Sequence, residues 1–189
     1  VNTPTGHPIT INAFEVESYK DTNGRERTRP TDKVKPVTVP YYANWVPKRS
    51  VKYPFAYLMQ YPDPAVIQLL HKHGIRIERI RETVKLDVQT ITITDLKPAG
   101  RLNQGHYTDS IMVGYADEKK EIPAGTLIVR TAQPLGTLAA YLLEPETDDG
   151  LLYWNYWDKY LAPQWGGSFL PYPVTKVISA QEIESEVIN

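Results

Sequence analysis

The chain has 189 residues, of which 41% are hydrophobic and 23% are charged, and this balance is typical of folded globular domains rather than of disordered, collagen-like or coiled-coil chains. A formal net charge of -1 provides no long-range field to attract a polyanion, so we expect no nucleic-acid partner. The chain has no cysteine, which excludes disulfides and thiolate chemistry, and without an apolar run near the roughly 20 residues that cross a bilayer we expect no membrane span.

The first 50 residues predict β-structure. Residues Ile9 to Tyr19 alternate roughly between apolar and polar, and Asp21 to Gly24, which follow after Lys20, contain the Asn-Gly pair that is typical of a tight hairpin turn. Val34 to Tyr42 also has strand character. Because Pro36 and Pro40 each remove a backbone donor, we expect this segment to be an edge strand.

Residues 55 to 80 predict a strand, a helix and a second strand. In the middle, Asp63 is typical of an N-cap, Pro64 suits the first helical position and Gly74 ends the helix. The segment from Ile75 to Ile80 alternates again between apolar and polar. The whole unit has about the length that a parallel crossover needs.

The stretch from Thr83 to Thr94 changes its apolar face part-way along. Alternate residues from 84 to 88 share one face, whereas Ile91 and Ile93 lie on the other. We therefore expect a bulge or bend near Gln89 and Thr90.

The second half of the chain predicts strands and helices in alternation. Strands are expected over 106–115, 126–131 and 172–178, with a turn over 123–125, and a helix over 134–144. A third helix is expected from Asp148 or Asp149 to about Leu161. The segment from Gln181 to Asn189, which contains three glutamates, is expected to form a mobile terminus.

These elements together predict an α+β fold. We expect mostly antiparallel or mixed β-sheets with a sandwich-like part, a strand–helix–strand unit, and two further helices packed on a sheet. Residues 1–189 are expected to form a single domain. Alternatively, two interleaved layers would comprise a β-rich layer of 1–50 and 83–122 and an α/β layer of 53–82 and 123–178.

The histidines do not show the spacing of a metal site. His71 and His73 are separated by about 200° around the predicted helix, so they cannot bind one ion together. His106 and Asp109 would point to opposite faces of a strand. We therefore predict no catalytic residue, no metal ligand and no cofactor in this chain. A hydrolase that used Glu144 and Asp149 would need these carboxylates roughly 5–9 Å apart in a cleft.

One stretch, from Leu142 to Trp157, crowds four acids next to four large aromatic residues. The acids do not match a calcium-binding loop, so we interpret Pro145 as the end of one helix and Asp148 or Asp149 as the cap of the next. The aromatic residues at 153, 156, 157 and 160 have the helical spacing of a buried stripe. Rings that are more exposed are candidates for stacking on a sugar or for contact with another domain: Tyr41, Tyr42, Trp45, Trp154 and Trp165.

The segment from Ile122 to Leu161 resembles the C-terminal region of bacterial secreted zinc carboxypeptidases, the carboxypeptidase A-like metallopeptidases. The resemblance rests on a Thr-x-Gln-Pro turn at Thr131 to Pro134, the long motif at Leu138 to Gly150, and the pair Trp154-Asn155. Upstream segments that match in the same order extend it over nearly the whole chain: 35–42, 55–60, 69–80 and 105–115.

This resemblance implies a non-catalytic C-terminal accessory domain of a metallocarboxypeptidase-like protein that takes part in proteolysis. The family binds zinc through a His-x-x-Glu pair and a later His in a preceding catalytic domain, and no His of this chain has Glu three positions on. The implied partner is that preceding peptidase domain, and the implied location is secreted or periplasmic. The alternative from a different class is a targeting module that binds glycan or peptidoglycan, and a peptide is a further candidate ligand.

Overall fold

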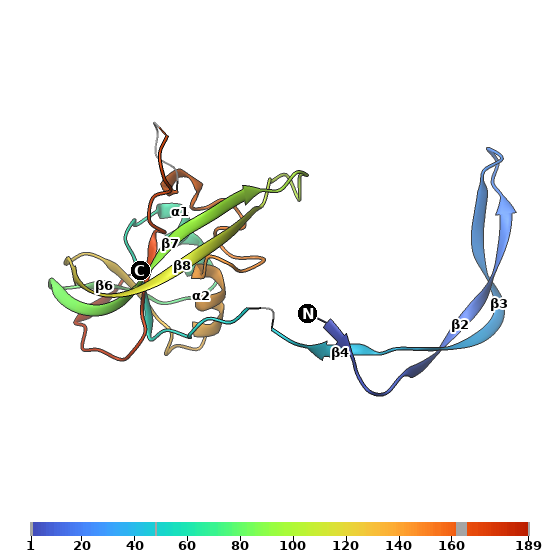
Figure 1. Ribbon diagram of the computed structural model, residues 1–189, viewed down its shortest axis with the longest axis horizontal. Coiled ribbons are helices and arrows are strands. Elements are labelled where there is room, and N and C mark those ends of the chain that lie inside the picture. Colours follow the sequence, from blue (N-terminus) through green and yellow to red (C-terminus); the bar gives the residue numbers. More distant parts are fainter. Residues whose placement is uncertain (1, 48, 162–165, 189) are drawn as a thin grey trace. The chain divides into compact units, whose positions relative to one another are not determined.

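The computed structural model describes residues 2–47, 49–161 and 166–188 (Figure 1). The chain divides into two compact units, Val1–Val51 and Lys52–Asn189, which we call the ribbon unit and the core unit. Every strand pairing in the described residues is antiparallel. The α+β class with mostly antiparallel sheets is therefore confirmed.

The ribbon unit consists of two separate strand pairs. The short strands β1 (Asn2–Pro4) and β4 (Tyr42–Trp45) pair with each other, and the long strands β2 (Ile9–Lys20) and β3 (Glu26–Val39) form a twisted two-stranded ribbon, drawn in blue in Figure 1. Each strand of the ribbon has one free edge. Pro36 can therefore lie within β3, and the prediction of an edge strand is confirmed.

The turn of the ribbon is closed by one side chain. The Asp21 carboxylate accepts hydrogen bonds from the backbone amides of Asn23 and Arg25, both at 2.9 Å. Gly24 has a φ of 73°, a conformation that costs glycine little. The predicted hairpin is confirmed, with its turn at the predicted Asn-Gly pair.

The core unit is built on one seven-stranded sheet with the order β11-β6-β9-β5-β10-β7-β8. Figure 1 shows β7 and β8 as a long hairpin, in green and yellow. The strands are β5 (Ala56–Met59), β6 (Ile77–Ile80), β7 (Val84–Pro98), β8 (Asp109–Ile122), β9 (Leu127–Arg130), β10 (Val174–Val177) and β11 (Ser185–Ile188).

Helix α1 (Pro64–Lys72) forms as the sequence predicts. The Asp63 side chain accepts from the amides of Ala65 and Val66, and Pro64 occupies the first turn. Strands β5 and β6 both run antiparallel to β9, which lies between them. The two strands that flank α1 are therefore parallel to each other, although they are not neighbours.

Both faces of the sheet are buried, each in its own hydrophobic core. Tyr57 and Met59 of β5 belong to a helix-side core that includes residues of α1 and of α2 (Gly136–Leu143). Ala56 and Leu58, which alternate with them, belong to a second core on the opposite face. The second core also includes Leu86 and Val88 from the first half of β7, together with Ile183.

The prediction of a bulge near Gln89 and Thr90 is wrong. The pairing of β7 with β8 continues without interruption through these residues, and the register shifts only between Ile93 and Asp95. The apolar face changes because the strand passes from one core to the other: Leu86 lies in the second core, whereas Ile91 lies in the helix-side core. A strand that is buried on both sides of its sheet needs no bulge to change faces.

The predicted third helix does not form. Residues 151–157 are turns, and only Asp158–Tyr160 forms a short 3-10 helix. Asn155 has a φ of 65°, which interrupts any helix at this point. A Cβ atom on Gly150 would lie 2.1 Å from the Thr147 hydroxyl oxygen, so the loop is closely packed against the end of α2.

The mobile terminus expected over 181–189 is wrong for residues 185–188, because β11 pairs with β6 along four residues and the Ser185 hydroxyl donates to Glu78 at 2.6 Å. Strands β7 and β8 belong to the sheet of the core unit, and the alternative of two interleaved layers stays a prediction. The strand expected from His106 begins only at Asp109. A single accessory domain over 1–189 stays a prediction.

Candidate functional site

A groove of about 550 Å³ lies against α2 in the core unit. Its aromatic and polar lining comes from four parts of the chain: His73, His106, Tyr141, and the group Asp149, Trp154, Asn155 and Tyr156. Leu69, Leu138 and Leu142 supply an apolar lining. We call this site the aromatic groove.

The Trp154 ring is held in place within the aromatic groove. Its indole nitrogen donates a hydrogen bond to the Asp149 carboxylate. The imidazole of His106 and the ring of Tyr153 pack nearly perpendicular to it, with centroids at 5.5 Å and 5.3 Å. A ring that is fixed by three contacts in this way loses little further freedom when a ligand binds.

The acids next to Trp154 serve as hydrogen-bond acceptors and not as helix caps, which corrects the sequence interpretation. Asp148 accepts from the Tyr141 hydroxyl, and this bond raises the pKa of Tyr141 to about 12. Asp149 accepts from Trp154. Both contacts bind the loop that follows α2 to groups that line the groove.

A second set of contacts places His106 beside Trp154. The Asn155 side-chain amide donates to the Tyr107 carbonyl at 3.0 Å and contacts the Asp109 carboxylate at 3.4 Å. Burial and the neighbouring Asp158 raise the pKa of Asp109 above its usual value. The loop before β8 is thereby joined to the loop that carries Trp154.

Glu144, the first acid of the stretch, lies in the core and not in the groove. Its carboxylate accepts a hydrogen bond from Tyr57 at 2.7 Å and forms an ion pair with Lys176 at 2.7 Å, and the Lys176 side chain is completely buried. The Lys176 ammonium also lies 5.0 Å from the centre of the Tyr115 ring. Burial, together with Glu144, holds the pKa of Tyr57 well above its usual value.

The aromatic stripe predicted over 153–160 is found only in part. Trp157 is completely buried, whereas Tyr156 and Tyr160 are half-buried and pack against the helix-side core. Tyr153 instead packs edge-on against Trp154. Helical spacing fails here because the segment turns instead of continuing as a helix.

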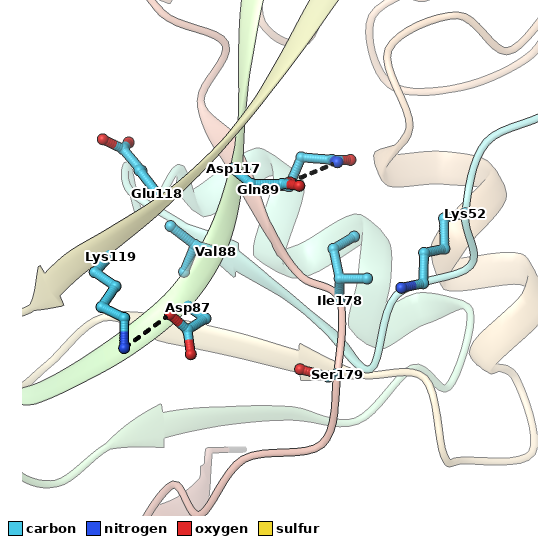
Figure 2. A pocket seen from close by; sticks show the side chains of 9 residues that line it. All are labelled: Lys52, Asp87, Val88, Gln89, Asp117, Glu118, Lys119, Ile178 and Ser179. Carbon is cyan, nitrogen blue, oxygen red and sulfur yellow. Dashed lines mark hydrogen bonds and ion pairs between the residues drawn. The ribbon is translucent and has the colours of Figure 1, made fainter.

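A polar groove of about 430 Å³ lies beside the β7–β8 hairpin (Figure 2). Two of its side-chain pairs join residues that are directly opposite in the register, Asp87 with Lys119 and Gln89 with Asp117. Such cross-strand pairs stabilise the exposed part of a sheet. Figure 2 shows Lys52, Ile178 and Ser179 across from these pairs.

The aromatic residues predicted as a ligand platform belong to different units of the chain. Tyr41, Tyr42 and Trp45 belong to the ribbon unit, where they are 47%, 55% and 76% exposed. Trp154 lines the aromatic groove of the core unit. Trp165 lies outside the described residues. Ligand binding by these residues stays a prediction.

Within the described parts of the chain, no group of three or more His, Asp or Glu side chains could hold a metal ion. His73 lines the aromatic groove, whereas His71 is half-buried beside it on α1. None of the helices within the described ranges has the length and hydropathy needed to cross a membrane. The prediction that the chain holds no cofactor stays a prediction.

Comparison with known proteins gives no relative. No protein-family model matches the chain, and neither a curated protein nor a solved structure matches it.

Sequence reasoning found Trp154 but not the rest of the aromatic groove. His73 is weighed only as a metal ligand together with His71, and Asp149 is predicted as a cap, because each residue is considered only within its own segment. The groove combines residues 69–73, His106, 138–142 and 149–156, and no spacing in the sequence links these four parts. Gly150 and Asn155 were the available signal, since both residue types are typical of turns.

Proposed function

We propose that the chain is a non-catalytic accessory domain of a secreted or periplasmic zinc carboxypeptidase-like protein. In this proposal the core unit is a stable scaffold, and the ribbon unit docks on the preceding peptidase domain of the same polypeptide. The resemblance from Ile122 to Leu161 supports the family. The exposure of the ribbon supports the docking role.

The observation that carries this proposal is the apolar surface on both faces of the β2–β3 ribbon. Ile9 and Ile11 are two positions apart in β2 and therefore point to the same face, where they are 39% and 46% exposed. On the other face, Phe14 lies opposite Val34, next to Val16, and these three are 52%, 56% and 69% exposed. An isolated two-stranded hairpin is marginally stable in water, and contiguous apolar patches mark interaction surfaces. Burial of both faces by a partner domain would stabilise the ribbon.

The contacts of the acids in the stretch from Leu142 to Trp157 also support a structural role. Glu144 forms the buried ion pair with Lys176, and Asp148 and Asp149 accept hydrogen bonds from Tyr141 and Trp154. Each of these acids therefore has a protein partner that fixes the end of α2 and the following loop.

The catalytic side of the proposal is tested on the purified chain. Zinc content is measured by mass spectrometry, and hydrolysis is measured with blocked dipeptides that end in Phe, Arg or Glu. We expect less than about 0.1 zinc per chain and no turnover. Stoichiometric zinc together with turnover that a chelator abolishes would overturn the proposal.

The docking role is tested by thiol accessibility, because the chain has no native cysteine. Val16→Cys places a thiol on the ribbon, and Lys85→Cys is a matched control at an exposed position of β7. Maleimide labelling is compared between this chain and a longer polypeptide that includes the preceding peptidase-like domain. We expect the thiol at position 16 to react at least about tenfold more slowly in the longer polypeptide, with no change at position 85. Equal rates at position 16 would contradict docking.

A further inference from the structure

We propose that the aromatic groove of the core unit binds a saccharide that carries no negative charge. This inference goes beyond the accessory role and does not rest on it. It concerns Trp154 and the residues that fix it, and it assigns no role to the exposed rings of the ribbon unit.

The first argument is the presentation of the Trp154 ring. One face of a sugar ring carries C–H groups that pack well on a flat aromatic surface, and the indole is the largest such surface among the side chains. Asp149 and His106 hold the indole before any ligand arrives. The groove therefore supplies a stacking surface whose orientation is already determined.

The second argument is the combination of leucine and polar side chains around the ring. Leu69 and Leu138 offer apolar contact, while His73 and His106 present imidazoles. A neutral imidazole has one donor and one acceptor, which suits sugar hydroxyls because each hydroxyl both donates and accepts. The volume of about 550 Å³ lies within the range of roughly 300–1,000 Å³ that is typical of ligand pockets.

The third argument is charge. Asp149 lines the groove, and Asp148 is bonded to Tyr141, which also lines it. These two carboxylates disfavour uronic acids, sialic acids and phosphorylated sugars. An aromatic groove with an acid could also hold a cationic side chain. Here, however, the leucines that line the groove beside Trp154 offer a cation no partner, whereas they suit the C–H groups of a sugar, which favours the uncharged ligand.

The experiment uses the full chain and defined probes. Cellotriose, chitotriose, xylotriose and maltotriose are titrated to about 10 mM, and binding is followed by saturation-transfer NMR and by tryptophan fluorescence. Trilysine and a galacturonic acid trimer serve as cationic and anionic probes. The wild-type chain is compared with Trp154→Ala and with Trp45→Ala, a matched removal of an indole from the ribbon unit, where Trp45 is 76% exposed.

We expect saturable binding of at least one neutral trisaccharide, and a loss of about tenfold or more in affinity for Trp154→Ala. Trp45→Ala should change the affinity by less than about twofold. A second variant, His106→Ala, keeps the indole and should weaken binding by a smaller factor, so the test holds even if Trp154→Ala folds poorly. Binding of no neutral trisaccharide, binding of trilysine alone, or loss of binding in Trp45→Ala but not in Trp154→Ala would each overturn the inference. None of these outcomes bears on zinc content or ribbon docking, which test the accessory role separately.

Discussion

The chain contains two long antiparallel hairpins that have opposite environments. In the core unit, β7 and β8 pair over 15 and 14 residues, and their apolar side chains enter two cores. In the ribbon unit, β2 and β3 pair over 12 and 14 residues, and their apolar side chains remain exposed. Pairing alone is therefore not what distinguishes a stable sheet from a ribbon; burial of the apolar faces is.

The strongest test compares a buried ion pair of the core unit with an exposed ion pair of the ribbon unit. Lys176→Ala leaves Glu144 buried without its cation, so we expect the free energy of unfolding to fall by about 3–5 kcal/mol. Arg29→Ala removes an ion pair with Glu17 in the ribbon, where the two side chains are 63% and 50% exposed, and should cost less than about 1 kcal/mol. Both values come from urea unfolding followed by circular dichroism.

A double variant separates the cost of leaving the Glu144 carboxylate unpaired from the cost of lost packing. Lys176→Met combined with Glu144→Leu replaces both charges by apolar groups, and we expect it to be much more stable than Lys176→Ala. A double variant as unstable as the single one would show that the cost comes from packing and not from the unpaired carboxylate.

Tryptophan truncation gives the next largest contrast. Trp157 is fully buried in the helix-side core, so Trp157→Ala should lower the free energy of unfolding by about 3–5 kcal/mol. Trp45→Ala removes the same ring from an exposed position and should change stability by less than about 0.5 kcal/mol. A nearly neutral result for Trp157→Ala would contradict the burial of this ring in the helix-side core and would make it a candidate ligand contact.

Isoleucine truncation compares the two hairpins directly. Ile91 of β7 is 2% exposed, whereas Ile11 of β2 is 46% exposed. We expect Ile91→Ala to cost about 2–5 kcal/mol and Ile11→Ala less than about 1 kcal/mol, measured by thermal and urea unfolding. Equal costs in this chain would mean that the ribbon is already buried, for example by self-association, and sedimentation would then detect an oligomer.

The smallest expected effect depends on pH. A hydrogen bond from the Lys159 ammonium lowers the pKa of Asp63 to about 2, with help from Tyr160 and the amides of Ala65 and Val66. The folded-state pKa lies below the unfolded value of roughly 3.9, so this stabilisation is present above about pH 4 and is lost as the pH falls towards 2. Asp63→Asn keeps a capping side chain and should cost about 1–2 kcal/mol at pH 7.

The check for Asp63 is a series of urea unfolding curves between pH 7 and pH 2. The difference between wild type and Asp63→Asn should disappear towards the acidic end. A difference that stays constant over this range would assign the effect to capping geometry and not to the charge.

Local signals predicted the parts of the fold that local contacts determine. The Asp63 cap, the Pro64 start and the Asn-Gly hairpin turn depend on neighbours within a few residues, and all three are present. The burial of both sides of β7 and the pairing of β11 depend on residues far along the chain, and there the predictions from sequence are wrong. An apolar face that changes sides indicates a bulge only if one face of the sheet is buried.

The aromatic groove could not be predicted for the same reason. Its residues come from α1, the loop before β8, α2 and the loop after α2, so only the folded sheet brings them together. The helical spacing of 153, 156, 157 and 160 was misleading because Gly150 and Asn155 turn the chain first. Turn-forming residues in or beside a short aromatic segment are therefore better predictors of its structure than the helical spacing of its aromatic residues.

The order of strands in the sheet has a consequence for biosynthesis. Strand β10, residues 174–177, lies between β5 and the β7–β8 hairpin, so the two sides of the sheet are joined by a strand that the ribosome makes more than 100 residues after β5. Until then, β5 and β7 each carry an open edge that can pair with other chains. The nascent core unit is thus a natural client for chaperones until β10 emerges.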